Sequence, residues 1–215
     1  MKWHNVEHNS EEWFELRAGK LTGSSFSKIM ANYGKAFGSP AHSVAKKIAV
    51  ERLSGRPSQS GYSNGHMERG HEQEPVAKQK YEEITFSKLK GGGFFDHGKI
   101  GVSPDGLIDD NGVSEIKSVI ANIHTDNVLR GSYDPAYKWQ FIGNLHYSER
   151  EYMDFISYCA DYPKDKQIYI CTIMREDVLD EIEMMEKRFE EFFKLVDEYQ
   201  EKILNAQYEV TYAKG

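Results

Sequence analysis

Residues 103–117 read SPDGLIDDNGVSEIK, and the remaining elements of the chain can be placed around this stretch. An acid follows a proline, a turn-rich spacer comes next, and an acid, an apolar residue and a lysine then stand in a short β-prone run. Asn111-Gly112 is a strong turn signal between two such runs. The stretch therefore predicts a β-hairpin with an acidic side chain on each strand, which is how a metal-dependent phosphodiesterase could carry its ligands.

The length of the hairpin loop determines whether these side chains can act together. Glu115 and Lys117 are two residues apart, so both leave the same face of their strand. A two-residue loop would place Asp105 on the opposite face, whereas a three-residue loop pairs Asp105 with Lys117. Gly112 suits the left-handed third position of such a loop. We therefore predict a three-residue loop, or an equivalent bulge, formed by Asp110, Asn111 and Gly112.

The hairpin residues have the chemistry of a hard-cation site. Two converging carboxylates, from Asp105 and Glu115, suit Mg²⁺ or Mn²⁺, which prefer oxygen ligands and keep several water molecules. Such a metal lowers the pKa of a bound water and stabilises charge on a phosphate, while Lys117 can orient the nucleophile or share that charge. A third carboxylate, from Glu74, would complete a two-metal site. The structural alternative is a surface turn followed by a solvated, salt-bridging strand face.

Helical patterns precede the hairpin. One helix over 9–18 begins with Asn9 or Ser10 as its N-cap, a second begins at 22–25, and a third runs from 39 to about 54. A loop rich in Gly, Ser and Pro covers 55–65 and leads to a helix over 66–83, in which Pro75 should introduce a kink or start a second segment. Three glycines at 91–93 then interrupt the regular secondary structure. Residues 94–95 and 99–102 have strand character.

A helix and two strands follow the hairpin. The helix covers 134–147 and carries Tyr137, Gln140 and Asn144 on one stripe, because these residues are three and four apart. The strands cover 151–159 and 167–174. In the first of them, alternate residues from Tyr152 to Tyr158 lie on one side.

A long helix over 178–204 is the last predicted element. Its apolar residues follow alternating steps of four and three, which makes a heptad seam. The seam predicts a packing face against the sheet, and the alternative is a subunit contact or a partner helix. Its residues are Val178, Ile182, Met185, Phe189, Phe192, Val196, Tyr199 and Ile203.

Composition limits the classes of protein. A chain of 215 residues can bury about 70% of the surface that its unfolded form exposes, so it needs no disulfide or metal to fold. Cys159 and Cys171 are the only cysteines, and they predict reduced, buried thiols in a cytoplasmic protein, with a disulfide in a secreted protein as the alternative. No apolar run approaches the roughly 20 residues that span a bilayer. We expect a soluble protein.

The net charge of −7 argues mildly against nucleic acid as a partner. The acidic residues, however, concentrate after residue 175, while many lysines and arginines lie in the first hundred residues. A locally basic face could therefore coexist with an acidic tail. Carboxylates that hold divalent cations would also be neutralised in use.

Five motifs between about Trp13 and Tyr147 resemble, in consistent order, the phage lambda-type exonuclease family. These YqaJ-like viral recombinase nucleases belong to the PD-(D/E)xK nuclease superfamily. The motifs are WFELRAGKLTGS at 13–24, GHEQEP at 70–75, SPDG at 103–106, EIK at 115–117 and YKWQ at 137–140. Each motif is weak alone, and five in the right order are specific.

The resemblance implies an activity and a metal site. Family members are processive 5′-to-3′ exonucleases that degrade one strand of duplex DNA and leave a 3′ single-stranded tail for a single-strand-annealing partner. By the same match, Asp105, Glu115 and the main-chain carbonyl of Ile116 would bind Mg²⁺, with Mn²⁺ as a substitute, and Glu74 would bind a second ion. Lys117 would position the attacking water.

The resemblance also implies residues that bind the end of the DNA. Arg17 and Ser24 would hold the 5′-phosphate, which agrees with a helix-start anion site at 22–25. Gln140 and Tyr137 would back the catalytic site. The family has a further acid before SPDG. Asp96 lies near that place, but its spacing differs by about one residue and we do not assign it to the site.

We predict an α/β fold with a restriction-endonuclease-like PD-(D/E)xK core, in which a central mixed β-sheet is flanked by helices. One nuclease domain would span 1–215, with a mainly helical part over 1–83, the sheet core over 84–174, and the long helix and tail over 175–215. Family members form trimeric rings around DNA, which implies a homo-oligomer acting on DNA ends. It would work in the cytoplasm, that of the host if the protein is phage-encoded, without contact with a membrane.

Two alternatives to this function stay open. One is another PD-(D/E)xK nuclease, such as a Cas4- or RecB-like enzyme, although two lone cysteines argue against the iron–sulfur cluster of most Cas4 proteins. The other is a non-catalytic DNA-end-binding module for recombination, which could keep the fold without metal.

Overall fold

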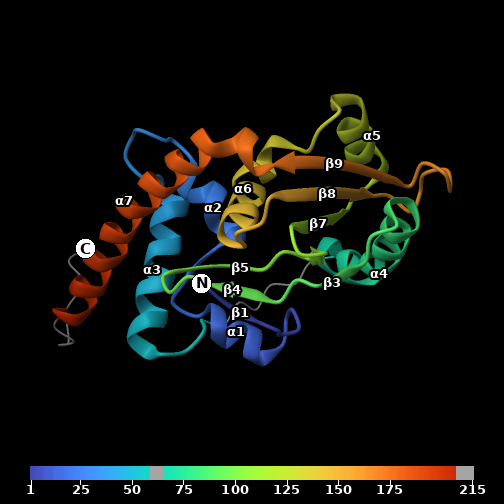
Figure 1. Cartoon of the computed structure of the whole chain (residues 1–215). Coiled ribbons are helices and arrows are strands. Elements are labelled where there is room, and N and C mark those ends of the chain that lie inside the picture. Colours follow the sequence, from blue (N-terminus) through green and yellow to red (C-terminus); the bar gives the residue numbers. More distant parts are fainter. Residues whose placement is uncertain (59–64, 207–215) are drawn as a thin grey trace.

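The computed structural model describes residues 1–58 and 65–206, and only the backbone of residues 65–71. The described strands form two β-sheets, with helices packed around them (Figure 1). The α/β class is as predicted, but the single central sheet that we expected is divided into a larger and a smaller sheet. Part of the loop predicted over 55–65 lies outside the described residues.

The larger sheet has five strands in the order β3-β6-β7-β8-β9. It is mixed, because β7 and β8 are parallel while the other neighbours are antiparallel. This sheet contains the hairpin of β6 and β7. The strands are β3 Leu89–Gly91, β6 Gly106–Ile108, β7 Gly112–Ser118, β8 Tyr152–Tyr158 and β9 Ile168–Met174.

The smaller sheet has four short strands in the order β1-β4-β5-β2. Two of them, β1 and β2, contain three and two residues, too few for an alternating pattern to predict. Their partners β4 and β5 correspond to the two strands expected after the glycine triplet. The strands are β1 Lys2–His4, β2 Leu21–Thr22, β4 Phe94–Asp96 and β5 Ile100–Val102.

The helices of the N-terminal third begin where the capping signals place them. Ser10 is the N-cap of α1, and its side-chain oxygen accepts a hydrogen bond from the backbone N–H of Trp13. The helix α4 continues through Pro75 as one element. The four helices are α1 Glu11–Arg17, α2 Gly23–Met30, α3 Ser39–Ser54 and α4 Gly65–Thr85.

The described part of the second half, which ends at residue 206, has three helices and two short 3₁₀ turns. The helix α5 lay between the predicted elements and was missed, because no side-chain N-cap marks its start and the residues that it buries, His124 and Asn127, are polar. Asp134 caps the 3₁₀ turn that leads into α6. The elements are α5 Ala121–Arg130, η1 Pro135–Tyr137, α6 Lys138–Tyr147, η2 Arg175–Val178 and α7 Leu179–Leu204.

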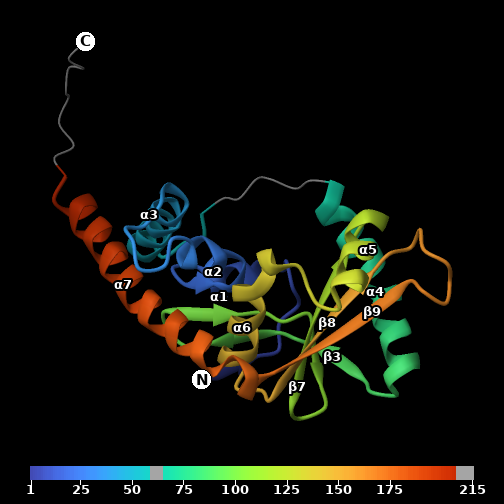
Figure 2. The ribbon, with the colours of Figure 1, turned by 90° about the horizontal axis from the view of Figure 1, so that it is seen from above.

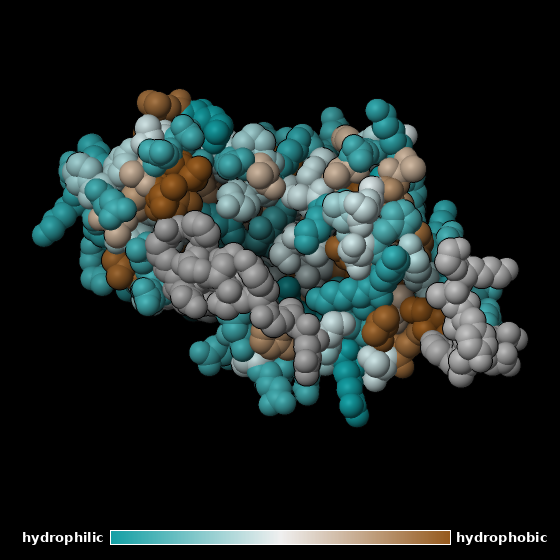
Figure 3. Space-filling model, turned by 180° about the vertical axis from the view of Figure 1, so that it is seen from behind, coloured by the Kyte–Doolittle hydropathy of each residue, from teal (hydrophilic) through white to brown (hydrophobic). Residues whose placement is uncertain are grey.

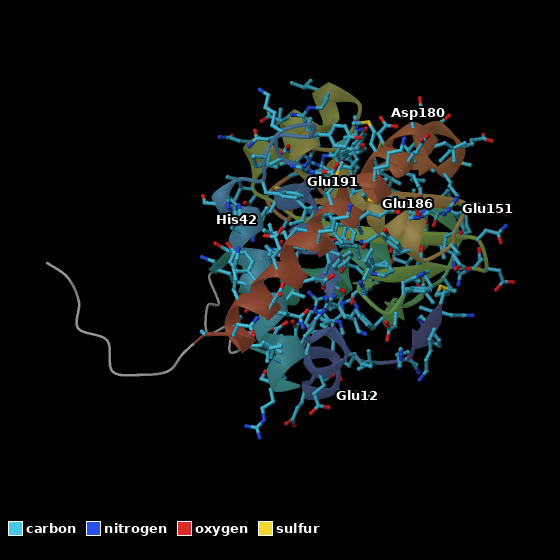
Figure 4. The ribbon with its side chains drawn as sticks, turned by 90° about the vertical axis from the view of Figure 1, so that its left-hand side faces the viewer. Glu12, His42, Glu151, Asp180, Glu186 and Glu191 are labelled. Carbon is cyan, nitrogen blue, oxygen red and sulfur yellow. The ribbon has the colours of Figure 1, made fainter. Side chains whose placement is uncertain are left out.

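The heptad seam of α7 packs mainly against other helices. Its residues from Val178 to Val196 are buried, and α7 lies along α3 and contacts α2 and α6 (Figure 2). The prediction of a face against the sheet was therefore wrong, because the apolar sides of α2 and α3 cover this stripe. The outer side of α7 carries acidic side chains, among them Asp180, Glu186 and Glu191 (Figure 4).

The helix α4 packs on one face of the larger sheet. Ala77 and Tyr81 of α4 form a small apolar cluster with Ile108, Ile116 and Ile156 of the strands. The cluster also contains Tyr158, and Tyr152 packs against it, so the predicted alternation along β8 is confirmed for these residues. A main cluster lies on the opposite face, where α6 packs on the strands and α2, α3 and α7 pack around it.

One buried hydrogen bond fastens α4 to the sheet. The Tyr81 hydroxyl donates to Asp154 Oδ2 at 2.6 Å, and the Thr172 hydroxyl donates to Asp154 Oδ1 at 2.7 Å. Asp154 is 6% exposed, so the loss of one donor leaves a carboxylate oxygen without compensation for its lost water.

We therefore expect Tyr81→Phe to lower the free energy of unfolding by about 1–3 kcal/mol, measured by urea denaturation. Tyr158→Phe is the matched control, because it belongs to the same cluster and its hydroxyl makes no hydrogen bond with a described residue. Equal stability of Tyr81→Phe and the control would contradict this view of α4.

No described helix is long and apolar enough to cross a lipid bilayer. Cys159 and Cys171 are both free thiols, as expected. Cys159 is buried, whereas Cys171 is only partly buried.

Candidate active site

A cavity of about 1410 Å³ is lined by most of the side chains that the sequence singled out; Tyr137 is not among its lining residues. It is lined from α1, α2, α3, α4, the β6–β7 hairpin and α6. The surface seen from behind in Figure 3 is mostly hydrophilic and is hollowed near its middle. The described lining has mixed charge, because it includes five acids, Glu7, Glu51, Glu74, Asp105 and Glu115, beside these basic side chains: Arg17, Lys20, Lys28, Lys47, Lys78 and Lys117.

The hairpin loop has three residues, as predicted, but it lies one position earlier in the chain. Ile108 pairs with Gly112, so the loop consists of residues 109–111, and Asp109 is the left-handed residue with φ 45°. Gly112 belongs to β7 and does not have a positive φ. A Cβ at Gly112 would lie 2.4 Å from Cζ of Tyr152, so glycine leaves room for this ring, and a larger residue would have to displace it.

The shifted loop keeps the side chains on one face. The register pairs Gly106 with Ser114, and one residue further it places Asp105 opposite Glu115 rather than Lys117. The predicted Asp105–Lys117 pairing is therefore wrong. The parity argument still holds, because a shift of two residues in register leaves every side chain on its face.

Glu115 is 2% exposed and accepts hydrogen bonds on both of its carboxylate oxygens. Lys117 Nζ lies 2.6 Å and Gln140 Nε2 lies 2.5 Å from Oε1. Asn144 Nδ2 lies 2.7 Å from Oε2. Gln140 and Asn144 are four residues apart on α6, so the predicted stripe of that helix points at Glu115.

Asp105 is held by the main chain of β7. Its Oδ2 accepts a hydrogen bond of 2.7 Å from the backbone N–H of Ile116, and its own N–H donates to the carbonyl of Ser114 at 2.9 Å. The side chain of Ile116 points the other way, into the cluster under α4. Asp105 and Glu115 are thus fixed side by side on neighbouring strands.

The glycine triplet allows another part of the chain to approach Asp105. A Cβ on Gly92 would lie 1.6 Å from the carbonyl oxygen and 2.6 Å from the carbonyl carbon of Pro104. Only glycine fits at this contact, because both atoms belong to the main chain. The sequence predicted an interruption of secondary structure at 91–93, and the contact with Pro104 explains why glycine stands at position 92.

Burial and mutual repulsion shape the electrostatics of the two acids. Burial raises the pKa of Asp105 above its ordinary value, although the charge of Lys117 opposes the shift. Burial and the charge of Asp105 raise the pKa of Glu115 to about 7. Burial disfavours the charge on Lys117, but Glu115 and Asp105 outweigh it and raise its pKa. The negative charge of the two buried acids is therefore unfavourable without a counter-ion, which favours the binding of a cation.

Glu74 lines the same cavity from α4, but it is turned toward another residue. It forms an ion pair of 2.7 Å with Lys78, one turn further along the helix. Among the described residues, no group of three or more His, Cys, Asp or Glu side chains lies close enough together to hold a metal ion. The structure thus brings together the pair Asp105 and Glu115, with Glu74 facing the same space at greater distance.

Arg17 and Ser24 lie on the wall next to these acids. The guanidinium of Arg17 stacks over the ring of Trp13, with Cζ at 3.8 Å from the ring centre, and donates to the Thr22 hydroxyl at 3.2 Å. Burial lowers the pKa of Arg17 to about 10, partly offset by the negative charge of Glu51. Ser24 is exposed in the first turn of α2.

The two groups of residues are connected through α6. A Cβ on Gly23 would lie 3.1 Å from Oδ1 of Asn144, so the start of α2 lies against the helix that holds Glu115. Tyr137 lies over the amine of Lys117, with Nζ at 5.2 Å from the ring centre. Asn144 was on the predicted stripe, but no motif indicated a role for it.

Asp96 does not line the cavity among the described residues. It forms an ion pair of 3.1 Å with Lys20 and accepts a hydrogen bond from the backbone N–H of Gly98. Through these contacts Asp96 stabilises the turn that follows β4.

Comparison with known proteins gives the family. The model of the YqaJ-like viral recombinase domain matches residues 12–151. No curated protein matches the sequence significantly.

Solved structures resemble about nine-tenths of the chain. LHK-Exo, an alkaline exonuclease from Laribacter hongkongensis, has a TM-score of 0.79 at 29% identity, over 91% of this chain and 96% of that chain. Its complex with dAMP has a TM-score of 0.80 at 30% identity, over 90% and 96%.

A phage-related exonuclease from Haemophilus somnus 129PT shares the fold, with a TM-score of 0.67 at 16% identity over 89% of this chain and 97% of that one. The family model covers more than half of the chain, and the alkaline exonuclease covers nearly all of it. The protein therefore belongs to the YqaJ-like viral recombinase family, and it is a deoxyribonuclease of the exonuclease class.

Proposed function

We propose that this exonuclease is metal-dependent, degrades one strand of double-stranded DNA in the 5′-to-3′ direction, and leaves 3′ single-stranded tails for single-strand-annealing recombination. One observation carries the proposal: Asp105, Glu115 and Lys117 share a cavity with Arg17 and Ser24. A pair of acids suited to a cation thus lies beside side chains suited to a terminal phosphate. The structurally similar LHK-Exo was solved in complex with dAMP, which has the chemistry of a mononucleotide product.

The cofactor that suits these residues is Mg²⁺, with Mn²⁺ as a substitute, and two ions are proposed. The donor set fits a hard cation, because Asp105 and Glu115 offer buried carboxylate oxygens in surroundings that disfavour their charge. These two side chains and the main-chain carbonyl of Ile116 would hold one ion, and Glu74 would hold the second. When bound, the metal supplies a water of lowered pKa and neutralises charge on the phosphate.

The protein's own side chains prepare the site for this chemistry. Gln140 and Asn144 fix the two oxygens of Glu115 from α6, so the carboxylate cannot turn away. Lys117 keeps its proton because two acids flank it, and its amine would hold the attacking water by a hydrogen bond. Tyr137 limits where that amine can point.

The 5′ end of the strand would be held on the wall next to these acids. Arg17 offers a planar donor group for a phosphate, and its stacking on Trp13 fixes the orientation of that group. Ser24 and the free N–H groups at the start of α2 would add further donors. A terminal phosphate bound there would place the first phosphodiester near Asp105 and Glu115.

The test is digestion of linear duplex DNA with Mg²⁺, comparing 5′-phosphorylated and 5′-hydroxyl ends. We expect the wild type to prefer the phosphorylated end and Arg17→Ala to lose that preference, by about 10- to 100-fold, because a charge-assisted hydrogen bond is removed. An unchanged preference would remove Arg17 from the site. Digestion only from the 3′ end would overturn the proposed polarity.

Partners and assembly follow from the same proposal. The protein would act on double-stranded DNA ends in the cytoplasm, as a trimeric ring, and would pass its product to a single-strand-annealing protein. The whole chain would serve as one nuclease domain. The mass of the protein in solution, measured by light scattering, tests the ring, and a monomeric mass would contradict it.

A further inference from the structure

Glu51 is a buried acid on the wall of the same cavity, and the chemistry described above does not use it. It lies in the last turn of α3 and is 4% exposed. Its Oε2 accepts a hydrogen bond of 2.9 Å from the backbone N–H of Gly19, and its Oε1 accepts one of 2.8 Å from the backbone N–H of Ser58. A buried carboxylate costs free energy unless it is hydrogen-bonded, and a negative charge beside a phosphate site costs more. The hydrogen bonds of Glu51 therefore indicate what it does there.

Those contacts hold the turn that follows Arg17. Arg52, the next residue of α3, donates from Nε to the carbonyl of Gly19 at 2.9 Å. Both main-chain polar groups of Gly19 are therefore bound by consecutive residues of α3. Gly19 has φ 72°, and a Cβ there would lie 2.9 Å from Cγ of Arg52, so the turn fits closely against this helix.

The turn connects the two elements that carry the proposed phosphate ligands. Arg17 is the last residue of α1, and the chain passes through Gly19 into β2 and the start of α2. Thr22 accepts the hydrogen bond of Arg17 at 3.2 Å, so the guanidinium and the start of α2 are already joined across the turn. A change in the turn would therefore move Arg17 and Ser24 relative to each other.

The charge of Glu51 also acts on Arg17. Burial disfavours the charged guanidinium, and Glu51 is the acid whose negative charge opposes this effect. Lys47 lies 3.7 Å from Glu51 and is itself exposed, so water partly screens that ion pair. The buried acid thus favours a charged Arg17 while it binds the turn.

We propose that Glu51 is a positioning residue for recognition of the DNA 5′-phosphate: through Gly19 it fixes the turn that sets Arg17 and the start of α2 around one phosphate. This inference rests on the proposed function, since it takes Arg17 and Ser24 as the phosphate ligands. Glu51 itself does not touch the DNA. Arg52 supports the same turn and is tied to α7 by contacts with Asp197 at 3.5 Å and Gln200 at 3.4 Å.

The test compares kcat/KM on 5′-phosphorylated and 5′-hydroxyl duplex ends for Glu51→Gln. Gln keeps the size of the side chain, but its amide NH₂ must face one of the two backbone N–H groups, so one bond is lost. We expect the ratio of kcat/KM for the two ends to fall about tenfold, mainly through a higher KM for the phosphorylated end. A merely structural role would lower both values together and leave their ratio unchanged, which would overturn the inference.

Matched variants separate the possible causes. Val50→Ala changes an exposed neighbour on α3 and should keep the wild-type ratio. Glu51→Asp retains the charge and should recover part of the ratio. If Glu51→Gln does not fold, Arg52→Gln frees the same turn from its other bond and should lower the ratio too, and an unchanged ratio there would count against the inference. A wild type without any phosphate preference would instead overturn the proposed function itself.

Discussion

Asp105→Asn is expected to reduce Mg²⁺-dependent digestion of 5′-phosphorylated duplex DNA by about 10³-fold or more. Asn has the shape of Asp, and its carbonyl oxygen can still accept the hydrogen bond that the N–H of Ile116 gives to Asp105. The variant should therefore fold normally. It lacks the negative charge that a hard cation requires, so single-turnover release of nucleotides should be nearly lost.

The hairpin provides a control for this variant. Asp110→Asn removes an acid of the same type from the exposed loop, and it should digest DNA at the wild-type rate. Undiminished digestion by Asp105→Asn would sink the assignment of the metal site. No digestion by the wild type with any divalent metal would leave DNA-end binding without catalysis as the function.

Thermal stability tests the same residue without catalysis. Burial raises the pKa of Asp105 in the folded, metal-free protein, so the folded state prefers the protonated acid. The stability that depends on this group is present below the ordinary pKa and is lost as the pH rises through the folded pKa. In EDTA at about pH 8, Asp105→Asn should therefore melt about 2–4 °C above the wild type, and the difference should shrink toward acidic pH. Mg²⁺ should raise the melting temperature of the wild type only.

Gly92→Ala should disrupt both the fold and the site. The new Cβ would lie 1.6 Å from the carbonyl oxygen of Pro104 and 3.3 Å from the backbone N of Gly106. These are main-chain atoms, so no side-chain rotation can relieve the overlap, and the segment that carries Asp105 must move. We expect the free energy of unfolding to fall by about 1–3 kcal/mol or more. Nuclease activity should fall strongly as well.

Gly91→Ala is the matched control, because a Cβ at Gly91 meets no atom within 4 Å. It should unfold and digest DNA much like the wild type. If both variants behave alike in urea denaturation and digestion, the contact between the glycine triplet and the hairpin does not matter for the site.

Local signals predicted the helices with clear caps and the hairpin. Ser10 caps α1, and Ser39 and Pro40 begin α3, because helix ends depend on residues within one turn of them. The face shared by Glu115 and Lys117 followed from the alternation of side chains along a strand. The strands β1 and β2 were not predicted, because two or three residues carry no periodicity and their pairing partners lie about eighty to ninety positions away.

The register of the hairpin shows where local reasoning stops. Asn111-Gly112 has the residues of a tight turn, and the sequence alone favoured Gly112 as the left-handed position. In the folded chain the ring of Tyr152, on the neighbouring strand, occupies the space next to Gly112, and Asp109 takes the left-handed conformation instead. The loop lies one position earlier than the local signal indicated, and Gly112 lies in β7 beside a residue forty positions away.

The order of five short motifs in the sequence was enough to indicate the family, and it pointed to Asp105, Glu115 and Lys117, which the structure brings into one cavity. This is possible because such residues are chosen for their chemistry, which their type reveals. The partners that hold them are different: Asn144 on Glu115, Gly92 against Pro104, and Glu51 on Gly19 are chosen for shape and hydrogen bonding across distant parts of the chain. Asn, Gly and Glu occur in many roles, so only the folded arrangement of α3, α6 and the two sheets shows which of them support the site.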